Sequence, residues 1–167
     1  MKLILLFLFI SYGNVAFANP DIPEVRNLYH KAATSKKSWT QLSKLLSPVD
    51  NKSSALLVCY KGAADMMEAK YVINPWSKLN SFRAGKKLIE EAVKRDSKNM
   101  EIRFLRYSVQ TNLPSFLDYN DDIDADKSFL IKNLYKMEDK TLKNSIIQYL
   151  SVTKACTEEE INRLRDE

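Results

Sequence analysis

The sequence predicts an all-α fold made of antiparallel helical hairpins, and three observations support this prediction. Apolar residues recur three and four positions apart between the prolines, which is the spacing of one helix face. The chain has only three glycines in 167 residues, whereas an all-β fold needs many tight turns. All connections but one are short, so successive helices are expected to be antiparallel neighbours. A short solenoid of stacked hairpins and an irregular orthogonal bundle both satisfy this pattern.

Two helices are expected before Pro48. The first has Asp21 as its N-cap and Pro23 in its first turn. The second begins at Ser38, with Gln41 at the spacing of a capping box, and ends at Pro48. The inward-facing residues of the two helices are Val25, Leu28, Tyr29 and Ala32, and then Trp39, Leu42 and Leu46.

Two longer helices are expected over residues 52–71 and 78–95, joined by a turn at Asn74-Pro75-Trp76. Gly85 lies in the middle of the second, where glycine costs about 1 kcal/mol relative to alanine. We therefore expect Gly85 to admit another helix at close range. The apolar stripes are Leu56, Cys59, Tyr60, Ala63 and Met67, and then Phe82, Gly85, Ile89 and Ala92.

Four shorter helices follow. Their predicted starts are Met100 after the cap Asn99, Asp126, Asp139, and Thr157, which forms a capping box with Glu160. Residues 114–125 form the longest irregular connection of the chain. The main apolar anchors are Ile102, Leu105 and Val109; Leu130, Leu134 and Met137; Leu142, Ile146, Tyr149 and Leu150; and Ile161 and Leu164.

The composition excludes several classes of site. The isolated glycines exclude the glycine-rich phosphate loops of P-loop and dinucleotide-binding proteins. A zinc site of histidine and cysteine needs three or four ligands, and the chain offers only His30, Cys59 and Cys156. We expect no cofactor and no metal.

The N-terminus predicts export. A lysine at position 2 precedes the unbroken apolar run Leu3–Ile10, and Ala16-Phe17-Ala18 ends the segment as a cleavage site would. The apolar run is shorter than the roughly 20 residues of a membrane span. We therefore expect a signal peptide over 1–18, a single all-α domain over 19–167 in the periplasm or outside the cell, and no stable membrane insertion after cleavage.

The net charge of +5 is mild for 167 residues, and the lysines are scattered. Nucleic-acid binding needs a concentrated basic stripe, so no nucleic-acid partner is expected. A solvated surface explains these charges more simply than a weak attraction to anionic membrane or polysaccharide surfaces does.

The two cysteines leave two alternatives. In an oxidising compartment a Cys59–Cys156 disulfide would close a long loop and stabilise the fold by roughly 4–5 kcal/mol. Alternatively, both are free thiols packed on helix core faces.

Residues 82–99 resemble the second helix and exit turn of a tetratricopeptide repeat. Phe82, Gly85, Ile89 and Ala92 stand at the repeat's spacing, and Asp96-Ser97-Lys98-Asn99 is similar to its Asp-Pro-x-Asn-like turn, with Ser97 in place of proline. The resemblance covers one to one and a half repeats and implies a tetratricopeptide-like hairpin array.

A longer stretch, from Asn74-Pro-Trp-Ser-Lys-Leu through Arg103-Phe-Leu-Arg106 to Leu113-Pro-Ser-Phe-Leu117, resembles a group of uncharacterised exported bacterial proteins. This resemblance implies an exported helical domain and no particular chemistry.

A candidate binding face consists of Arg83, Arg103 and Arg106, with Trp76 as an exposed anchor after a proline. Concave faces of helical hairpins commonly bind peptides or acidic tails. The alternative, which we prefer for Arg103 and Arg106, is that they pair inside the chain with Glu90, Glu91 or the acidic loop.

The acidic loop, residues 118–126, contains five aspartates and is the second candidate site. It lacks the glycine and glutamate that a calcium loop requires at its sixth and twelfth positions, where Ile123 and Phe129 stand. Helix capping explains these acids more simply. His30 has no recognisable nucleophile or orienting partner nearby.

These observations predict an exported helical protein that binds a protein or peptide and is not an enzyme. The alternative function is a small-molecule or cation binder that uses the acidic loop 118–126.

Overall fold

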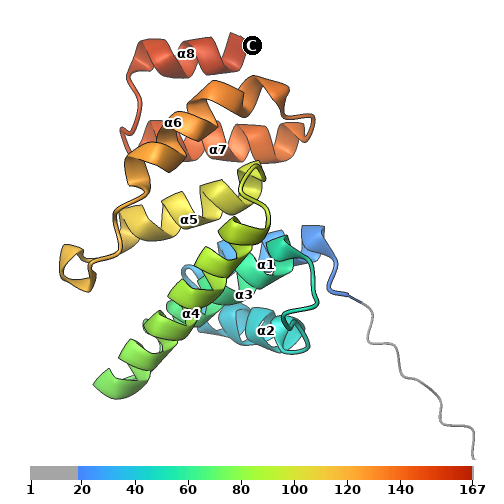
Figure 1. Ribbon diagram of the computed structural model, residues 1–167, viewed down its shortest axis with the longest axis vertical. Helices are drawn as coiled ribbons and strands as arrows, with labels where there is room; N and C mark the ends of the chain where they lie inside the picture. The colour runs from blue at the N-terminus through green and yellow to red at the C-terminus, as the bar shows by residue number, and fades with distance from the viewer. Residues whose placement is uncertain (1–18, 167) are drawn as a thin grey trace, which may run out of the picture.

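The computed structural model describes residues 19–166, and this part of the chain is entirely helical, with no strand (Figure 1). The predicted signal peptide, residues 1–18, lies outside the described residues. Eight α-helices and two 3-10 turns follow one another: α1 (Ile22–Ala32), α2 (Lys36–Leu46), α3 (Ala55–Glu68), α4 (Pro75–Arg95), α5 (Met100–Asn112), η1 (Ser115–Leu117), α6 (Ile123–Asn133), η2 (Leu134–Lys136), α7 (Lys140–Val152) and α8 (Glu158–Asp166).

The helices pair as consecutive hairpins, which confirms the predicted all-α hairpin architecture. Helix α1 packs most extensively on α2, α3 on α4, α5 on α6, and α7 on α8. Between hairpins, α3 contacts both α1 and α2, and α5 contacts both α3 and α4. In Figure 1 the helices α1–α4 form the lower part of the molecule, α5 crosses the middle, and α6–α8 form the upper part.

Two apolar cores lie on opposite sides of α5. The core of the first two hairpins includes Ile102 and Leu105 from α5, whereas the core around α6–α8 includes Phe104 and Tyr107. All four side chains are at least nine-tenths buried. The sequence pattern predicts a single row of core residues on α5. Because α5 lies between two cores, it has two such rows.

Helix α3 is buried on most of its circumference. Its stripe was expected to contain Cys59, Tyr60 and Ala63, and the structure also buries Leu57 and Val58 from the neighbouring face. Helices α1, α2, α4 and α5 all contact α3. This placement makes α3 the central helix of the lower part.

Gly85 admits a close helix approach, as predicted. It faces Gly62 where α3 packs on α4, and a Cβ atom at Gly62 would lie 2.7 Å from the carbonyl oxygen of Gly85. Contact at this range is possible only because both residues lack side chains.

Four predicted helix starts are wrong by two or three residues. Helix α3 was expected from residue 52 but begins at Ala55, after its cap Ser54. Helix α2 begins at Lys36, because the hydroxyl of Ser35, not Ser38, accepts from a first-turn amide. The predicted turn before α4 is its first turn, with the Asn74 side chain accepting from the Trp76 amide at 2.9 Å. Helix α6 begins at Ile123, so Asp126 lies within the helix.

Asp21 stands at the predicted N-cap position of α1, but its side chain accepts no capping hydrogen bond. The predicted cap Asn99, the predicted helix start at Asp139 and the predicted capping box of Thr157 are confirmed. Asn99 accepts from two first-turn amides of α5, and the Asp139 carboxylate accepts from the Leu142 amide at 3.0 Å. Thr157 and Glu160 form the reciprocal bonds of a capping box.

Both cysteines are free thiols in the structure. Cys59 belongs to the lower core, and Cys156 packs against the upper one. Of the helices within residues 19–166, none has the length and apolar character needed to cross a bilayer.

Candidate functional site

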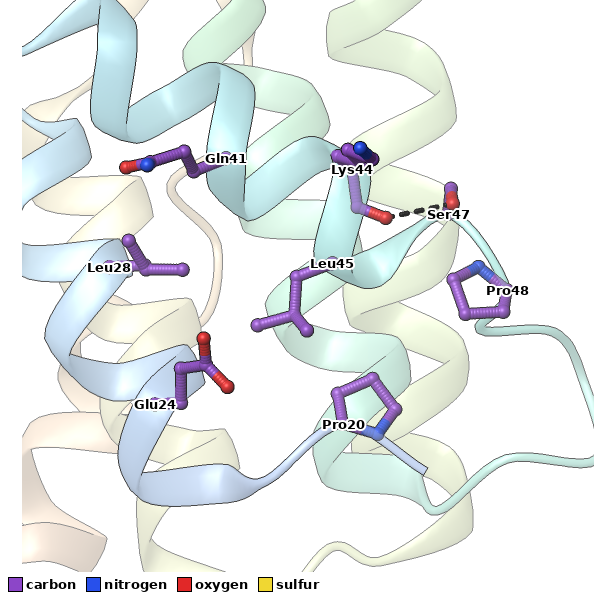
Figure 2. A pocket seen from close by; sticks show the side chains of 8 residues that line it. All are labelled: Pro20, Glu24, Leu28, Gln41, Lys44, Leu45, Ser47 and Pro48. Carbon is purple, nitrogen blue, oxygen red and sulfur yellow. Dashed lines mark hydrogen bonds between the residues drawn. The ribbon is translucent and has the colours of Figure 1, made fainter. Parts of the chain in front are cut away.

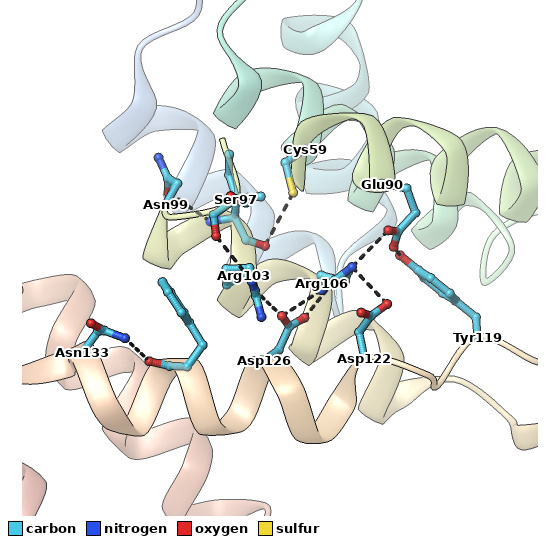
Figure 3. Close-up of polar contacts among 12 residues, drawn as sticks. Cys59, Glu90, Ser97, Asn99, Arg103, Arg106, Tyr119, Asp122, Asp126 and Asn133 are labelled. Carbon is cyan, nitrogen blue, oxygen red and sulfur yellow. Dashed lines mark hydrogen bonds and ion pairs between the residues drawn. The ribbon is translucent and has the colours of Figure 1, made fainter. Parts of the chain in front are cut away.

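The predicted face of Arg83, Arg103 and Arg106 does not form, because two of these arginines point inward (Figure 3). Arg106 is 4% exposed, and its guanidinium donates to both carboxylate oxygens of Asp126, at 2.7 and 2.9 Å. Arg103 pairs with the same carboxylate and lies over the ring of Phe129. A ligand at the surface cannot reach Arg106, so the internal pairing describes both residues.

The acidic loop supplies the partners of this arginine cluster. Asp126 is fully buried, and Asp122 lies 3.0 Å from Arg106. These two carboxylates are therefore paired with arginine guanidinium groups, and they are not free to bind a metal cation. No group of three or more histidine, cysteine or acidic side chains in residues 19–166 is arranged to hold a metal ion.

Glu90 of α4 completes what we call the outer ion cluster: Glu90, Arg103, Arg106, Tyr119, Asp122 and Asp126. Glu90 lies 3.0 Å from Arg106 and accepts a hydrogen bond from the Tyr119 hydroxyl at 2.6 Å. Burial lowers the pKa of Arg106. The hydrogen bonds and charge of Asp126, together with the charges of Glu90 and Asp122, outweigh burial and raise the pKa above its ordinary value, so the guanidinium stays charged. The cluster joins α4, α5, α6 and the η1 connection.

A second cluster, which the sequence analysis did not find, joins the first helix of every hairpin. We call it the inner ion cluster: Arg26 of α1, Tyr60 of α3, Glu101 of α5 and the α7 cap Asp139. Arg26 donates to both oxygens of Glu101, at 2.5 and 2.6 Å, and to Asp139 at 2.8 Å. Tyr60 donates to Glu101 at 2.5 Å.

Electrostatics keep the inner ion cluster in one protonation state. The hydrogen bond to Glu101 raises the pKa of Arg26 above its already high ordinary value. Burial, and then the negative charge of Glu101, raise the pKa of Tyr60, so its hydroxyl remains a donor. The only sequence feature that could have indicated this cluster is the position of Glu101 next to the core residue Ile102. Many exposed acidic residues share that position, so it does not identify a buried ion pair.

An apolar cleft of about 340 Å³ opens on the same layer of helices. We call it the hairpin groove. Its walls come from α1, α3, α5 and α7 or from the residues that directly follow α1, α3 and α5. They are Tyr29, Ala33, Ala63, Met66, Met67, Lys70, Phe104, Ser108, Val109, Asn112, Leu113 and Tyr149.

The hairpin groove and the inner ion cluster occupy successive turns of the same helices. Tyr29 follows Arg26 by three residues, and Phe104 follows Glu101 by three. The ion cluster thus fixes the spacing of the helices at one end, and the groove opens farther along them. A hydrogen bond also joins the end of α5 to α7, since the Tyr149 hydroxyl accepts from the side-chain amide of Asn112 at 2.7 Å.

Trp76 and Arg83 lie elsewhere, on α4. Trp76 is 76% exposed, and Arg83 is also exposed. The exposure of Trp76 agrees with the predicted anchor, but neither residue borders the hairpin groove.

A second concavity, of about 570 Å³, lies on the outer side of α1 and α2 (Figure 2). Leu28 and Leu45 face each other across it, between the charged side chains of Glu24 and Lys44. Pro20 and Pro48 stand at one end. Its charges are of both signs, so it selects no ligand class.

The groups with nucleophilic or acid–base chemistry do not converge. His30 is exposed, and its closest aromatic neighbour is Tyr29, edge-on at 6.3 Å between ring centroids. Cys59 is fully buried, and burial raises the pKa of its thiol. The hairpin groove contains neither residue.

Comparison with known proteins finds no matching family model, no similar curated protein and no similar solved structure.

Proposed function

We propose that this chain is an exported, non-catalytic interaction module, acting in the periplasm or outside the cell, that binds a segment of another protein in the hairpin groove. The observation that carries the proposal is the composition of the groove: the first helix of each hairpin contributes to one apolar cleft. Clefts with mainly apolar walls and a few polar groups are the usual form of binding sites.

The side chains of the groove suit a peptide with apolar anchors. Met66 and Met67 are unbranched and polarizable, so they adapt to different apolar partners. Phe104 and Tyr149 pack edge-on at 5.4 Å and give the groove a rigid aromatic wall. The side-chain nitrogen of Asn112 is used within the chain, since it donates to the Ser108 carbonyl and the Tyr149 hydroxyl. Its side-chain oxygen is exposed beside this wall and can accept from a peptide N–H group.

The inner ion cluster supports binding by holding the walls in place. Arg26 and Glu101 form a bidentate pair, which fixes geometry better than a single bond. A cleft that is already formed loses less entropy when a ligand binds. The proposal therefore predicts that binding depends on Arg26, although Arg26 does not line the groove.

Selection from a random peptide library against the folded protein tests this function. We expect the selected peptides to share apolar anchors and to lose at least about tenfold in affinity for the variant Met67→Gln. Val152→Gln is the matched control, because Val152 is an exposed apolar residue that does not line the groove. Equal affinities for the two variants would contradict the proposal.

A further inference from the structure

We propose that the connection of α3 and α4, with the first half of α4, binds the surface of an anionic phospholipid bilayer. We call this surface, residues 69–88, the hairpin tip. Its distinguishing feature is a pair of large apolar side chains in water: Ile73 is 94% exposed and Trp76 is 76% exposed. Exposed apolar neighbours of this kind mark interaction surfaces.

The hairpin tip carries positive charge without compensation. Residues 69–88 contain five lysines and arginines and no acidic residue. Lys86 is engaged with the Asp118 carbonyl and the Tyr119 ring. The others, Lys70, Lys78, Arg83 and Lys87, are exposed and take part in no ion pair within residues 19–166.

The acids that flank this segment in the sequence form no ion pairs with its lysines and arginines in the described part of the chain. Glu68, at the end of α3, accepts a hydrogen bond from the Ser81 hydroxyl at 2.6 Å and is half-buried. Glu90 belongs to the outer ion cluster and is bonded to Arg106 and Tyr119. The field at the hairpin tip is therefore positive and attracts anions.

One face of α4 presents both kinds of group. Trp76, Asn80, Arg83 and Lys87 follow one another at steps of four, three and four residues, which places them on one side of a helix. All four are exposed. The first turns of α4 project beyond the other helices at the lower left of Figure 1.

A bilayer fits this surface better than an acidic polypeptide does. Ile73 and Trp76 border neither of the clefts described above, so an extended polypeptide would find no groove beside them. A projecting helix end with tryptophan and lysine is suited to a flat surface, since tryptophan prefers the headgroup region. Basic residues near an anionic leaflet are each attracted to it.

The hairpin tip is separate from the proposed peptide site. The tip is formed mainly by α4, the second helix of its hairpin, whereas the groove lies on first helices. Lys70 alone borders both surfaces, so it is left unchanged in the test. Failure of one proposal consequently leaves the other standing.

Sedimentation with lipid vesicles tests the proposal. The chain from residue 19 onward, without the apolar segment 1–18 that would itself bind lipid, is mixed with vesicles of neutral phosphatidylcholine, with or without about 30% phosphatidylglycerol. We expect binding to the anionic vesicles only, weaker at high salt, with a blue shift of tryptophan emission. Trp76 is the exposed reporter, because Trp39 is half-buried and donates to the Ala64 carbonyl at 3.0 Å.

Two variants and their controls locate the surface. The double substitution Arg83→Glu and Lys87→Glu should weaken binding to anionic vesicles more than tenfold, and Trp76→Ala should remove the blue shift. The controls are Lys132→Glu with Lys140→Glu, and Tyr135→Ala, which change exposed residues of other helices. Circular dichroism verifies that each variant is folded.

Three outcomes would overturn the proposal. The first is equal binding to neutral and anionic vesicles, and the second is equal losses in the tip and control variants. The third is binding to polyglutamate, dependent on Arg83 and Lys87, without binding to vesicles, which would assign the tip to an acidic polypeptide.

Discussion

Gly62 of α3 and Gly85 of α4 face each other backbone to backbone, and neither position has room for a Cβ atom. A Cβ at Gly62 would meet the Gly85 carbonyl oxygen at 2.7 Å and the Leu88 Cβ at 2.9 Å. A Cβ at Gly85 would meet Met66 Cγ at 2.5 Å. The packing of the central helix α3 on α4 depends on this contact.

Gly62→Ala should therefore destabilise the fold by about 1–3 kcal/mol, because overpacking outweighs the gain in helix propensity. Urea unfolding followed by circular dichroism measures the change. At an open helical position the same substitution stabilises, so a more stable variant would refute the close contact. The exposed Ala84 is the control, where Ala→Gly should cost about 1 kcal/mol from propensity alone.

The outer ion cluster predicts that removing one negative charge from it strongly lowers the stability of the fold. Asp126→Asn removes the carboxylate that faces the buried Arg106 and should cost about 3–5 kcal/mol. Asp124→Asn is the matched control, because Asp124 is exposed in the same turn of α6. Similar unfolding free energies for the two variants would show that Asp126 does not hold Arg106.

A half-buried acid on α3 should make stability depend on pH. Burial, opposed by Lys61 and reinforced by Glu68, raises the pKa of Asp65 to about 6. Between about pH 4 and pH 6 the folded chain then holds a proton that the unfolded chain has lost, so stability falls as the pH rises. Asp65→Asn should flatten this fall and make the protein more stable above pH 6.

Thermal unfolding between pH 4 and pH 7 measures this contribution. Asp121→Asn is the control, since Asp121 is exposed and its removal should leave the pH dependence as it is. If the stabilities of the wild-type chain and of Asp65→Asn change with pH in the same way, Asp65 has the same pKa in the folded and the unfolded state, and the prediction is wrong.

Gln110 predicts a stabilising substitution. It is 2% exposed, and neither its amide nitrogen nor its amide oxygen has a hydrogen-bond partner within residues 19–166. Gln110→Met retains the volume and removes both polar atoms, so it should stabilise by about 1–2 kcal/mol. The exposed Gln148→Met should change the unfolding free energy by less than about 0.5 kcal/mol. A destabilised Gln110→Met would show that the amide is hydrogen-bonded in solution.

Local patterns in the sequence were enough to predict that the helices exist and roughly where they lie. Caps such as Asn99 and Asp139 act within one turn, and the stripe around Ile102 and Leu105 is a local pattern, so both could be read directly. The error at Asn74-Pro75-Trp76 has a local cause as well, because the same residues suit a turn and the first turn of a helix.

Contacts between distant residues set the limits of prediction. The pairing of Arg106 with the acidic loop was the preferred alternative in the sequence, but its exact partner was not. Asp126, twenty residues away, becomes that partner only when α6 folds onto α5. Arg26 and Asp139 are 113 residues apart, so no spacing in the sequence announces their pairing. The hairpin groove was missed for the same reason, since four separate helices supply its walls.

The methionine methyl groups test the proposed binding site most directly. Met66 and Met67 line the hairpin groove, whereas Met100 and Met137 lie beside a different concavity near α6. When a selected peptide is titrated into protein labelled with carbon-13 at its methionine methyls, the signals of Met66 and Met67 should shift and those of Met100 and Met137 should stay in place. Shifts confined to Met100 and Met137, or an unchanged spectrum with bound peptide, would contradict the account.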